Sequence, residues 1–228
     1  MFSAFRRLEM KQKDAFILLV AFLLFLVGIL LWWFFPQTAS WKKTIENPYF
    51  ATRDHQGNHY IINNGKSEVL RISKENLITA DISWNNHEED CFGEADEAAV
   101  DRDGNIYILD VLWNDTGLGL AMERVLRYTP DGKFDRVVFE NDYSETMITK
   151  RHLFSLVCVN DEIRFAAVDT DGKGFSTYVL KKGQNQAEQF TSFAWESAVE
   201  IQDFALDQDR GYFVIKNGTI YSFGDAGI

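Results

Sequence analysis

The sequence has little of what several protein classes require. Its 228 residues include only two cysteines and three prolines, so a disulfide scaffold and a multi-cysteine zinc module are excluded. Basic side chains are also scarce, with 23 against 34 acidic ones and a formal net charge of −11. Because a nucleic-acid binder needs cationic groups that displace counterions from phosphate, we expect no nucleic-acid partner.

Recognisable catalytic motifs are missing as well. There is no Gly-x-Ser-x-Gly, no His-Glu-x-x-His and no phosphate-binding glycine loop. The four histidines have no serine or cysteine beside them in a known catalytic arrangement. Carboxylates are plentiful, so a glycosidase-like acid/base pair stays open on composition alone. The sequence therefore favours a protein without catalytic activity, and an enzyme stays an open alternative.

One long apolar run is present. Ala15 to Phe35 contains no charge, and as a helix it would span roughly 31 Å, the thickness of a bilayer core. Four basic residues precede it, Trp32 and Trp33 lie near its end, and Trp41 follows. This pattern predicts a cytoplasmic tail at 1–14, a transmembrane helix at 15–35 and a linker at 36–44. The alternative is a cleaved signal peptide, for which Thr38-Ala39-Ser40 would be a poor cleavage site.

Either alternative places residues 45–228 outside the cytoplasm. The first 40 residues carry four basic and two acidic side chains, which leaves the remainder with 19 basic and 32 acidic ones and a net charge of −13. Such a domain would suit cationic partners or metal ions, although plain solubility explains the same charge.

Residues 45–228 contain an internal sequence repeat. Four segments, 50–62, 99–110, 156–168 and 204–215, each predict two strands joined by a tight polar turn. The predicted turns centre on Gly57, Gly104, Asp161 and Arg210. Asp-Gly and Gly-Asn pairs are typical of hairpin turns because these residues tolerate positive φ.

A second strand pair follows each segment. The further strands are expected at Val69–Ser73, Arg124–Phe134 continued by 136–139, Ser176–Leu180 and Thr219–Phe223. Four short antiparallel strands in roughly 50 residues have the period of a β-propeller blade. The sequence therefore predicts an all-β fold, a propeller-like array of about four four-stranded blades at 45–228, after one transmembrane α-helix.

The second unit carries a family resemblance. Ala99-Val-Asp-Arg-Asp-Gly-Asn-Ile-Tyr-Ile-Leu-Asp110, followed by Arg124-Val-Leu-Arg-Tyr-Thr-Pro-Asp-Gly-Lys-Phe134, resembles a blade of the NHL-repeat and gluconolactonase-like propellers. The resemblance implies a binding scaffold for protein or small ligands. Lactonase-type members hold a metal with acidic and amide side chains in the central pocket, and those ligands have no assignable counterparts here.

Four units are few for a closed ring, and the fourth ends after its third strand. Either Lys43–Phe50 supplies the missing strand, or the array is incomplete and is continued by further chain or closed by a partner. A longer gene product would also allow a sensor whose further domains follow residue 228.

Blade topology places the long connections on one face. These are expected at 85–96, 111–121, 141–152, 169–175 and 191–199, where a rigid scaffold usually carries function. Aromatic groups among carboxylates suit a cationic or sugar-like ligand or a basic protein surface. The predicted binding residues are Glu94, Asp96, Glu97, Trp113, Asn114, Asp115, Tyr143, Arg151, His152, Trp195 and Glu196.

Metal and disulfide signals are weaker. Asp101–Asn105 and Asp169–Gly172 are similar to fragments of calcium loops, yet both are also ordinary β-turns. We expect no cofactor and leave calcium as the alternative. His87 with Cys91 lacks a second ligand pair for zinc, and a Cys91–Cys158 bridge is permitted by the compartment. The leading interpretation is a membrane-anchored binding module, and the alternative is a metal-dependent lactonase or sugar hydrolase.

Overall fold

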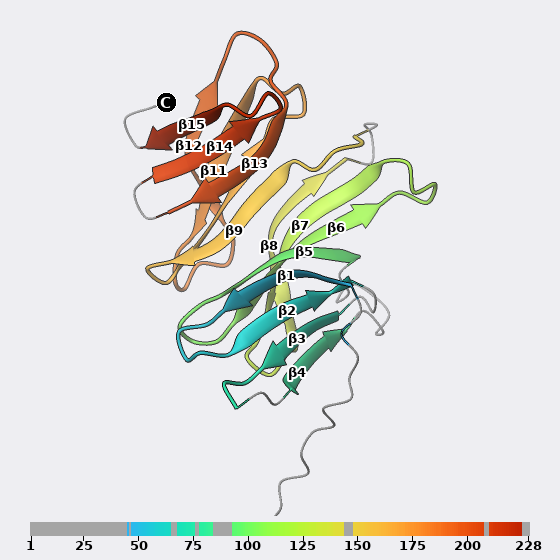
Figure 1. Cartoon of the computed structure of the whole chain (residues 1–228), viewed down its shortest axis with the longest axis vertical. Helices are drawn as coiled ribbons and strands as arrows, with labels where there is room; N and C mark the ends of the chain where they lie inside the picture. The colour runs from blue at the N-terminus through green and yellow to red at the C-terminus, as the bar shows by residue number, and fades with distance from the viewer. Residues whose placement is uncertain are drawn as a thin grey trace, which may run out of the picture. The chain divides into compact units, whose positions relative to one another are not determined.

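Four antiparallel sheets follow one another along the chain (Figure 1). The computed structural model describes residues 45, 47–64, 68–75, 78–83, 93–143, 148–207 and 210–224, all within the compact unit Thr44–Ile228. Blade 1 contains β1 (Pro48–Arg53), β2 (His59–Asn63), β3 (Glu68–Ile72) and β4 (Ile78–Ser83). Blade 2 contains β5 (Glu94–Val100), β6 (Ile106–Trp113), β7 (Leu120–Tyr128) and β8 (Phe134–Asp142). Blade 3 contains β9 (Leu153–Val159), β10 (Glu162–Val168), β11 (Gly174–Leu180) and β12 (Glu188–Ala194), and blade 4 contains β13 (Ile201–Leu206), β14 (Arg210–Ile215) and β15 (Ile220–Gly224).

The all-β, four-blade, propeller-like prediction is confirmed, including a last blade of three strands among the described residues. Two details of the prediction are wrong. Arg210 is the first residue of β14 and not the centre of a turn. The connections on the long-loop face are also shorter than expected, because β5 begins at Glu94 and β6 continues to Trp113. Cross-strand hydrogen bonds extend these strands through polar residues that resemble loop sequence.

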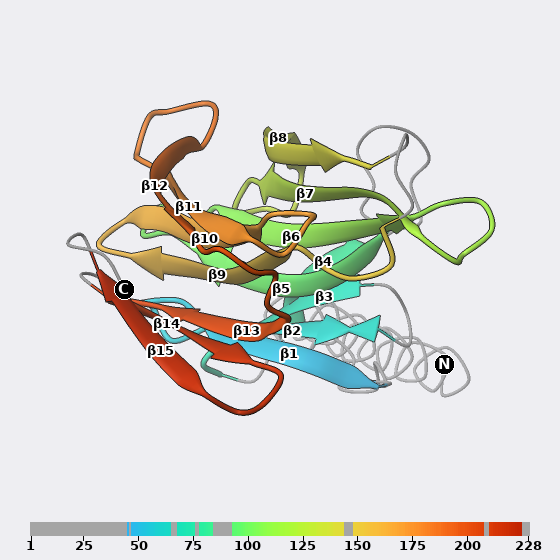
Figure 2. The same cartoon turned by 90° about the horizontal axis from the view of Figure 1, so that it is seen from above.

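The first strands of the successive blades lie next to one another in the middle of the array (Figure 1), and Figure 2 gives the same strands from above. β1 packs beside β5, β5 beside β9, and β9 beside β13. β1 and β13 line the same cavity. They do not pack against each other in the way that the first strands of successive blades do. The suggestion that Lys43–Phe50 completes the last blade is wrong for its described part, because Pro48 to Phe50 pair with β2 inside blade 1.

Three apolar clusters hold neighbouring blades together. Tyr60 and Ile62 meet Ile108 between blades 1 and 2. Leu109 belongs to a second cluster, which fills the space between blades 2 and 3. Between blades 3 and 4 the cluster is largely aromatic and surrounds the fully buried ring of Phe175. Each blade alone has no way to bury these faces, so packing of neighbours stabilises the array.

The turn between the first two strands has the same construction in blades 1 and 2. The sequence Asp-x-x-Gly-Asn-x-Tyr begins at Asp54 and again at Asp101. In the second copy, the Asp101 carboxylate accepts hydrogen bonds from the Asn105 main-chain and side-chain nitrogens, at 2.8 and 2.7 Å, and from the Tyr107 hydroxyl at 3.1 Å. The carboxylate that resembled a calcium ligand is therefore used to close the hairpin.

Replacing Asp101 with alanine is expected to lower the free energy of unfolding by about 2 kcal/mol, because three donors lose a buried acceptor. Asp103 is the matched control, since it lies in the same turn and makes only an exposed ion pair with Lys182. We expect Asp103→Ala to change stability by less than about 0.5 kcal/mol. Urea denaturation of both variants measures the difference, and equal effects would contradict the role given to Asp101.

The predicted membrane segment at 15–35, its tail at 1–14 and the linker at 36–44 lie outside the described residues. Within the part of the chain that is described, no helix combines the length and the apolar character that a membrane crossing needs. His87 and Cys91 also lie outside it. Cys158 is a free, half-buried thiol on β9.

Candidate functional site

The four innermost strands surround an axial cavity of about 600 Å³. Its aromatic wall consists of Tyr49, Phe50, Phe154 and Phe204. Its charged groups are three carboxylates, from Asp96, Glu97 and Asp203, and the guanidinium of Arg151. The cavity is therefore acidic on balance, with one cation to offset three anions.

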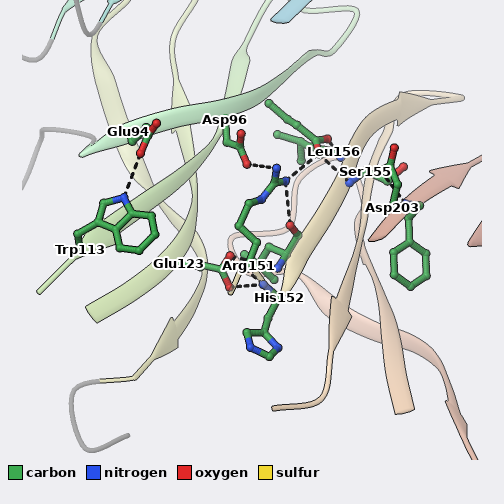
Figure 3. Close-up of polar contacts among 12 residues, drawn as sticks. Glu94, Asp96, Trp113, Glu123, Arg151, His152, Ser155, Leu156 and Asp203 are labelled. Atoms are coloured by element: carbon green, nitrogen blue, oxygen red, sulfur yellow. Dashed lines mark hydrogen bonds and ion pairs between the residues drawn. The ribbon is translucent and has the colours of Figure 1, made fainter. Parts of the chain in front are cut away.

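Arg151 lies between β5 and β9 and is held from several sides (Figure 3). Its guanidinium forms ion pairs with Asp96 and with Glu97, the latter at 3.1 Å between Nη2 and Oε1. It also donates to the Leu153 carbonyl at 3.1 Å and lies 5.1 Å from the ring centre of Phe154. Burial alone would lower the pKa of Arg151, but the two carboxylates raise it above its ordinary value. The cation is thus permanent and already paired.

Asp96 is the most enclosed of the three carboxylates, with 7% of its surface exposed. Burial raises the pKa of its carboxyl, and the charge of Arg151 offsets only part of that effect. The charge of Asp96 in turn raises the pKa of the neighbouring Tyr49 phenol. A second cation entering the cavity would stabilise the ionised form of Asp96.

Glu97 joins blade 2 to blade 3. Its carboxylate accepts hydrogen bonds from the main-chain nitrogens of Ser155 and Leu156, at 3.1 and 2.6 Å. Ser155 turns its amide toward Glu97 by adopting a φ of 59°, which is unusual for a residue other than glycine. The Ser155 hydroxyl also accepts from the Leu206 amide at 3.1 Å, so this residue links β5, β9 and β13.

A second buried carboxylate fixes the start of β9. Glu123 of β7 accepts from the main-chain nitrogens of His152 and Leu153, at 3.0 and 3.3 Å, and from the Tyr143 hydroxyl at 2.8 Å. Burial raises the pKa of Glu123, and these hydrogen bonds offset part of the rise. The His152 ring contacts the Val168 carbonyl through Nδ1 at 3.0 Å. Glu123, Tyr143 and His152 therefore position the start of β9, which lies just after Arg151.

The predicted residues of the second connection lie elsewhere. Trp113 donates from Nε1 to Glu94 at 3.0 Å, and both side chains are exposed. The Asn114 side-chain oxygen accepts from the Thr116 hydroxyl at 2.7 Å and so shapes the turn. Asp115 is exposed. None of these side chains lines the axial cavity.

Trp195 is part of the packing between blades 3 and 4. Its Nε1 donates to the Gly172 carbonyl at 2.8 Å, and its ring stacks on Phe213 and contacts Phe175. The next residue, Glu196, is exposed. The predicted set is therefore divided, and only Asp96, Glu97 and Arg151 gather at the cavity.

Sequence reasoning missed Tyr49, Ser155 and Asp203. Each of them lies directly before one of the aligned repeat segments, which begin at Phe50, Leu156 and Phe204. Since the first strand of each blade faces the axis, that repeat position was the signal that could have found them. In the described part of the chain, no three His, Cys, Asp or Glu side chains are arranged to hold a metal ion.

Comparison with known proteins gives fold likenesses only. No family model matches the chain, and no curated protein matches it. The chain is similar to a solved structure of streptogramin B lyase, with 10% identity and a TM-score of 0.46, over 80% of this chain and 56% of that one. The structure of BamB from Moraxella catarrhalis gives 12% identity and a TM-score of 0.44, over 75% of this chain and 41% of that one. The structure of YCF48 bound to D1 peptide gives 12% identity and a TM-score of 0.46, over 78% of this chain and 51% of that one. The chain therefore spans about half the length of the structures it matches.

Proposed function

We propose that the chain is a membrane-anchored extracytoplasmic binding module whose axial cavity takes a positively charged side chain of a partner protein. The observation that supports this is the charge of the cavity wall, where Arg151 is already paired and Asp203 is not. Asp203 is exposed, and its carboxylate forms no ion pair with any described residue. A carboxylate beside aromatic rings is a favourable site for an ammonium or guanidinium group.

The anchor in this proposal rests on the apolar run at 15–35, and the extracytoplasmic location on the basic residues before it. The finer assignment to the NHL-type propellers belongs to the same proposal. Extraction of cell membranes at alkaline pH, followed by protease treatment of sealed vesicles, tests the anchor and the orientation. Release of the chain into the soluble fraction would count against both.

Asp203→Asn is expected to weaken binding of a fluorescent lysine-rich peptide to the full chain about fivefold to tenfold, because one charge-assisted contact is lost. Asparagine keeps the oxygen that accepts from the Phe204 amide at 2.8 Å, so the strand is preserved. Asp115→Asn removes the same charge outside the cavity and should leave the affinity unchanged. Fluorescence anisotropy measures both, and equal losses would show that only overall charge matters.

The lactonase-like alternative stays a prediction of the sequence. It requires a metal held by acidic and amide side chains, and no described observation favours it over binding. The sensor alternative also stays a prediction.

A further inference from the structure

A second cavity, of about 420 Å³, lies at the other end of the inner strands. Phe50, Leu156 and Val157 line both cavities, so the two share a wall. The second one opens among the short turns that follow β1, β5 and β9. We call it the turn-side cavity.

Three basic residues line the turn-side cavity. They are Arg53 at the end of β1, His55 in the turn that follows, and Arg102 in the turn after β5. All three are exposed, and none forms an ion pair with a carboxylate of the described residues. In a chain with 34 acidic and 23 basic side chains, a cavity whose lining holds two guanidinium groups and a single carboxylate is unusual.

Three carboxylates lie near these basic residues. Asp54 accepts hydrogen bonds from the Asn58 main-chain and side-chain nitrogens, at 2.8 and 2.7 Å. Asp103 pairs with Lys182 at 2.7 Å, and Asp161 lies 3.6 Å from the same ammonium group. Asp161 also lines the cavity, but its Oδ1 accepts from a main-chain nitrogen, at 3.0 Å. Asp161 is the only carboxylate among the described residues that line the cavity. The hydrogen bond from the Arg102 amide, together with the charges of Lys182 and Arg102, lowers its pKa, so Asp161 is ionised and offsets one of the positive charges. The lining remains cationic on balance, with Arg53 and Arg102 against one carboxylate.

The position of Arg53 depends on a glycine. Gly57 has a φ of 91°, and a Cβ built on it would come within 3.1 Å of the Arg53 Nη2 atom. The guanidinium therefore lies against the turn and does not extend freely into solvent. Arg102 is anchored through its main chain, since its amide donates to Asp161 across to blade 3 at 3.0 Å.

The inner wall of the turn-side cavity is apolar. It is formed by Phe50, Ala99, Val100, Leu156, Val157 and Cys158. Burial raises the pKa of the Cys158 thiol to about 11, which keeps it uncharged at neutral pH. The cavity thus combines a cationic rim with an uncharged interior.

We infer that the turn-side cavity binds a small organic anion, with its carboxylate between Arg53 and Arg102 and its apolar body against Leu156 and Val157. Guanidinium groups bind carboxylates through charge-assisted hydrogen bonds, and burial of the apolar body adds affinity. The site is separate from the acidic end of the axial cavity, so it does not depend on the function proposed for that end.

The probe is 4-fluorobenzoate, titrated into the purified full chain and followed by its fluorine NMR line width. We expect saturable binding in the millimolar range. The double variant Arg53→Gln, Arg102→Gln should weaken it at least about tenfold, because both contacts to the carboxylate are lost. Both positions are exposed, and an unchanged melting temperature confirms that the variant folds.

Three controls decide the result. Lys173→Gln, Lys181→Gln removes two exposed charges outside this cavity and should leave binding unchanged. Uncharged 4-fluorobenzamide should not bind, and acetate, which has almost no apolar body, should not displace the probe. The inference is overturned if the benzamide binds as well as the benzoate, if both double variants lose the same affinity, if acetate competes equally, or if the intact chain shows no saturable binding.

Discussion

Replacing Glu123 with alanine is expected to lower the free energy of unfolding by about 3–5 kcal/mol, enough to unfold much of a marginally stable protein. Glu123 is fully buried and accepts hydrogen bonds from two main-chain nitrogens and the Tyr143 hydroxyl. Its removal leaves those donors without an acceptor in a site that water does not reach. Each such orphaned donor costs on the order of 1–3 kcal/mol.

Chemical denaturation of three variants tests this. Glu123→Gln keeps one acceptor oxygen and should lose about half as much stability as Glu123→Ala. Glu140→Ala, on the exposed side of neighbouring β8, should change stability by less than about 0.5 kcal/mol. If the glutamine and alanine variants are equally unstable, the charge of Glu123 matters and its hydrogen bonds do not.

A binding effect should accompany the stability effect. Glu123 holds His152 and Leu153, which directly follow Arg151, so its loss moves the cation away from Asp96 and Glu97. At temperatures where Glu123→Gln remains folded, its affinity for a lysine-rich peptide should differ from that of the unchanged chain. An unchanged affinity would show that the position of Arg151 does not depend on the start of β9.

The second large effect is expected at Phe175. Phe175→Ala should cost about 3–5 kcal/mol, because a fully buried ring is replaced by a cavity. The ring contacts five others, with centroid distances between 4.9 and 5.8 Å. Three of these partners belong to blade 4: Phe204, Phe213 and Phe223. Blade 4 should therefore separate from blade 3 before the other blades unfold.

Limited proteolysis with tryptophan fluorescence follows this separation, since Trp195 lies 5.8 Å from Phe175. Phe190→Ala is the control, because its ring is 52% exposed and contacts Arg164 at 5.6 Å. We expect that control to cost less than about 1 kcal/mol. A single cooperative transition in Phe175→Ala, with unchanged cleavage in blade 4, would contradict the order of unfolding.

Much of the fold could be predicted because hairpins are local. Asn160 and Asp161 both have positive φ, as a two-residue turn of the primed type requires, and Asn-Asp marks such a turn in the sequence. Alternating apolar residues around each turn then give the strand pairs and the repeat. The four blades follow from these short-range patterns.

The arrangement of the residues at the axial cavity could not be predicted in the same way. From blade topology, Asp96 was expected in the long connection 85–96 and Glu97 on the same long-loop face, yet both lie on β5 and pair with Arg151. The hydrogen bond from the Ser155 amide to Glu97 joins residues 58 positions apart, and no local pattern indicates such a contact. The positive φ of Ser155 is likewise set by its neighbours in space.

The serial packing of the first strands has a consequence for biosynthesis. Every blade consists of strands that are consecutive in the chain, and the first strand of each blade packs against the first strand of the blade before it. A blade can therefore form while the ribosome is still translating the next one, with its exposed face covered as soon as that neighbour emerges. The time between blades, set by translation, is the period in which each apolar face is open to chaperones or to mispairing.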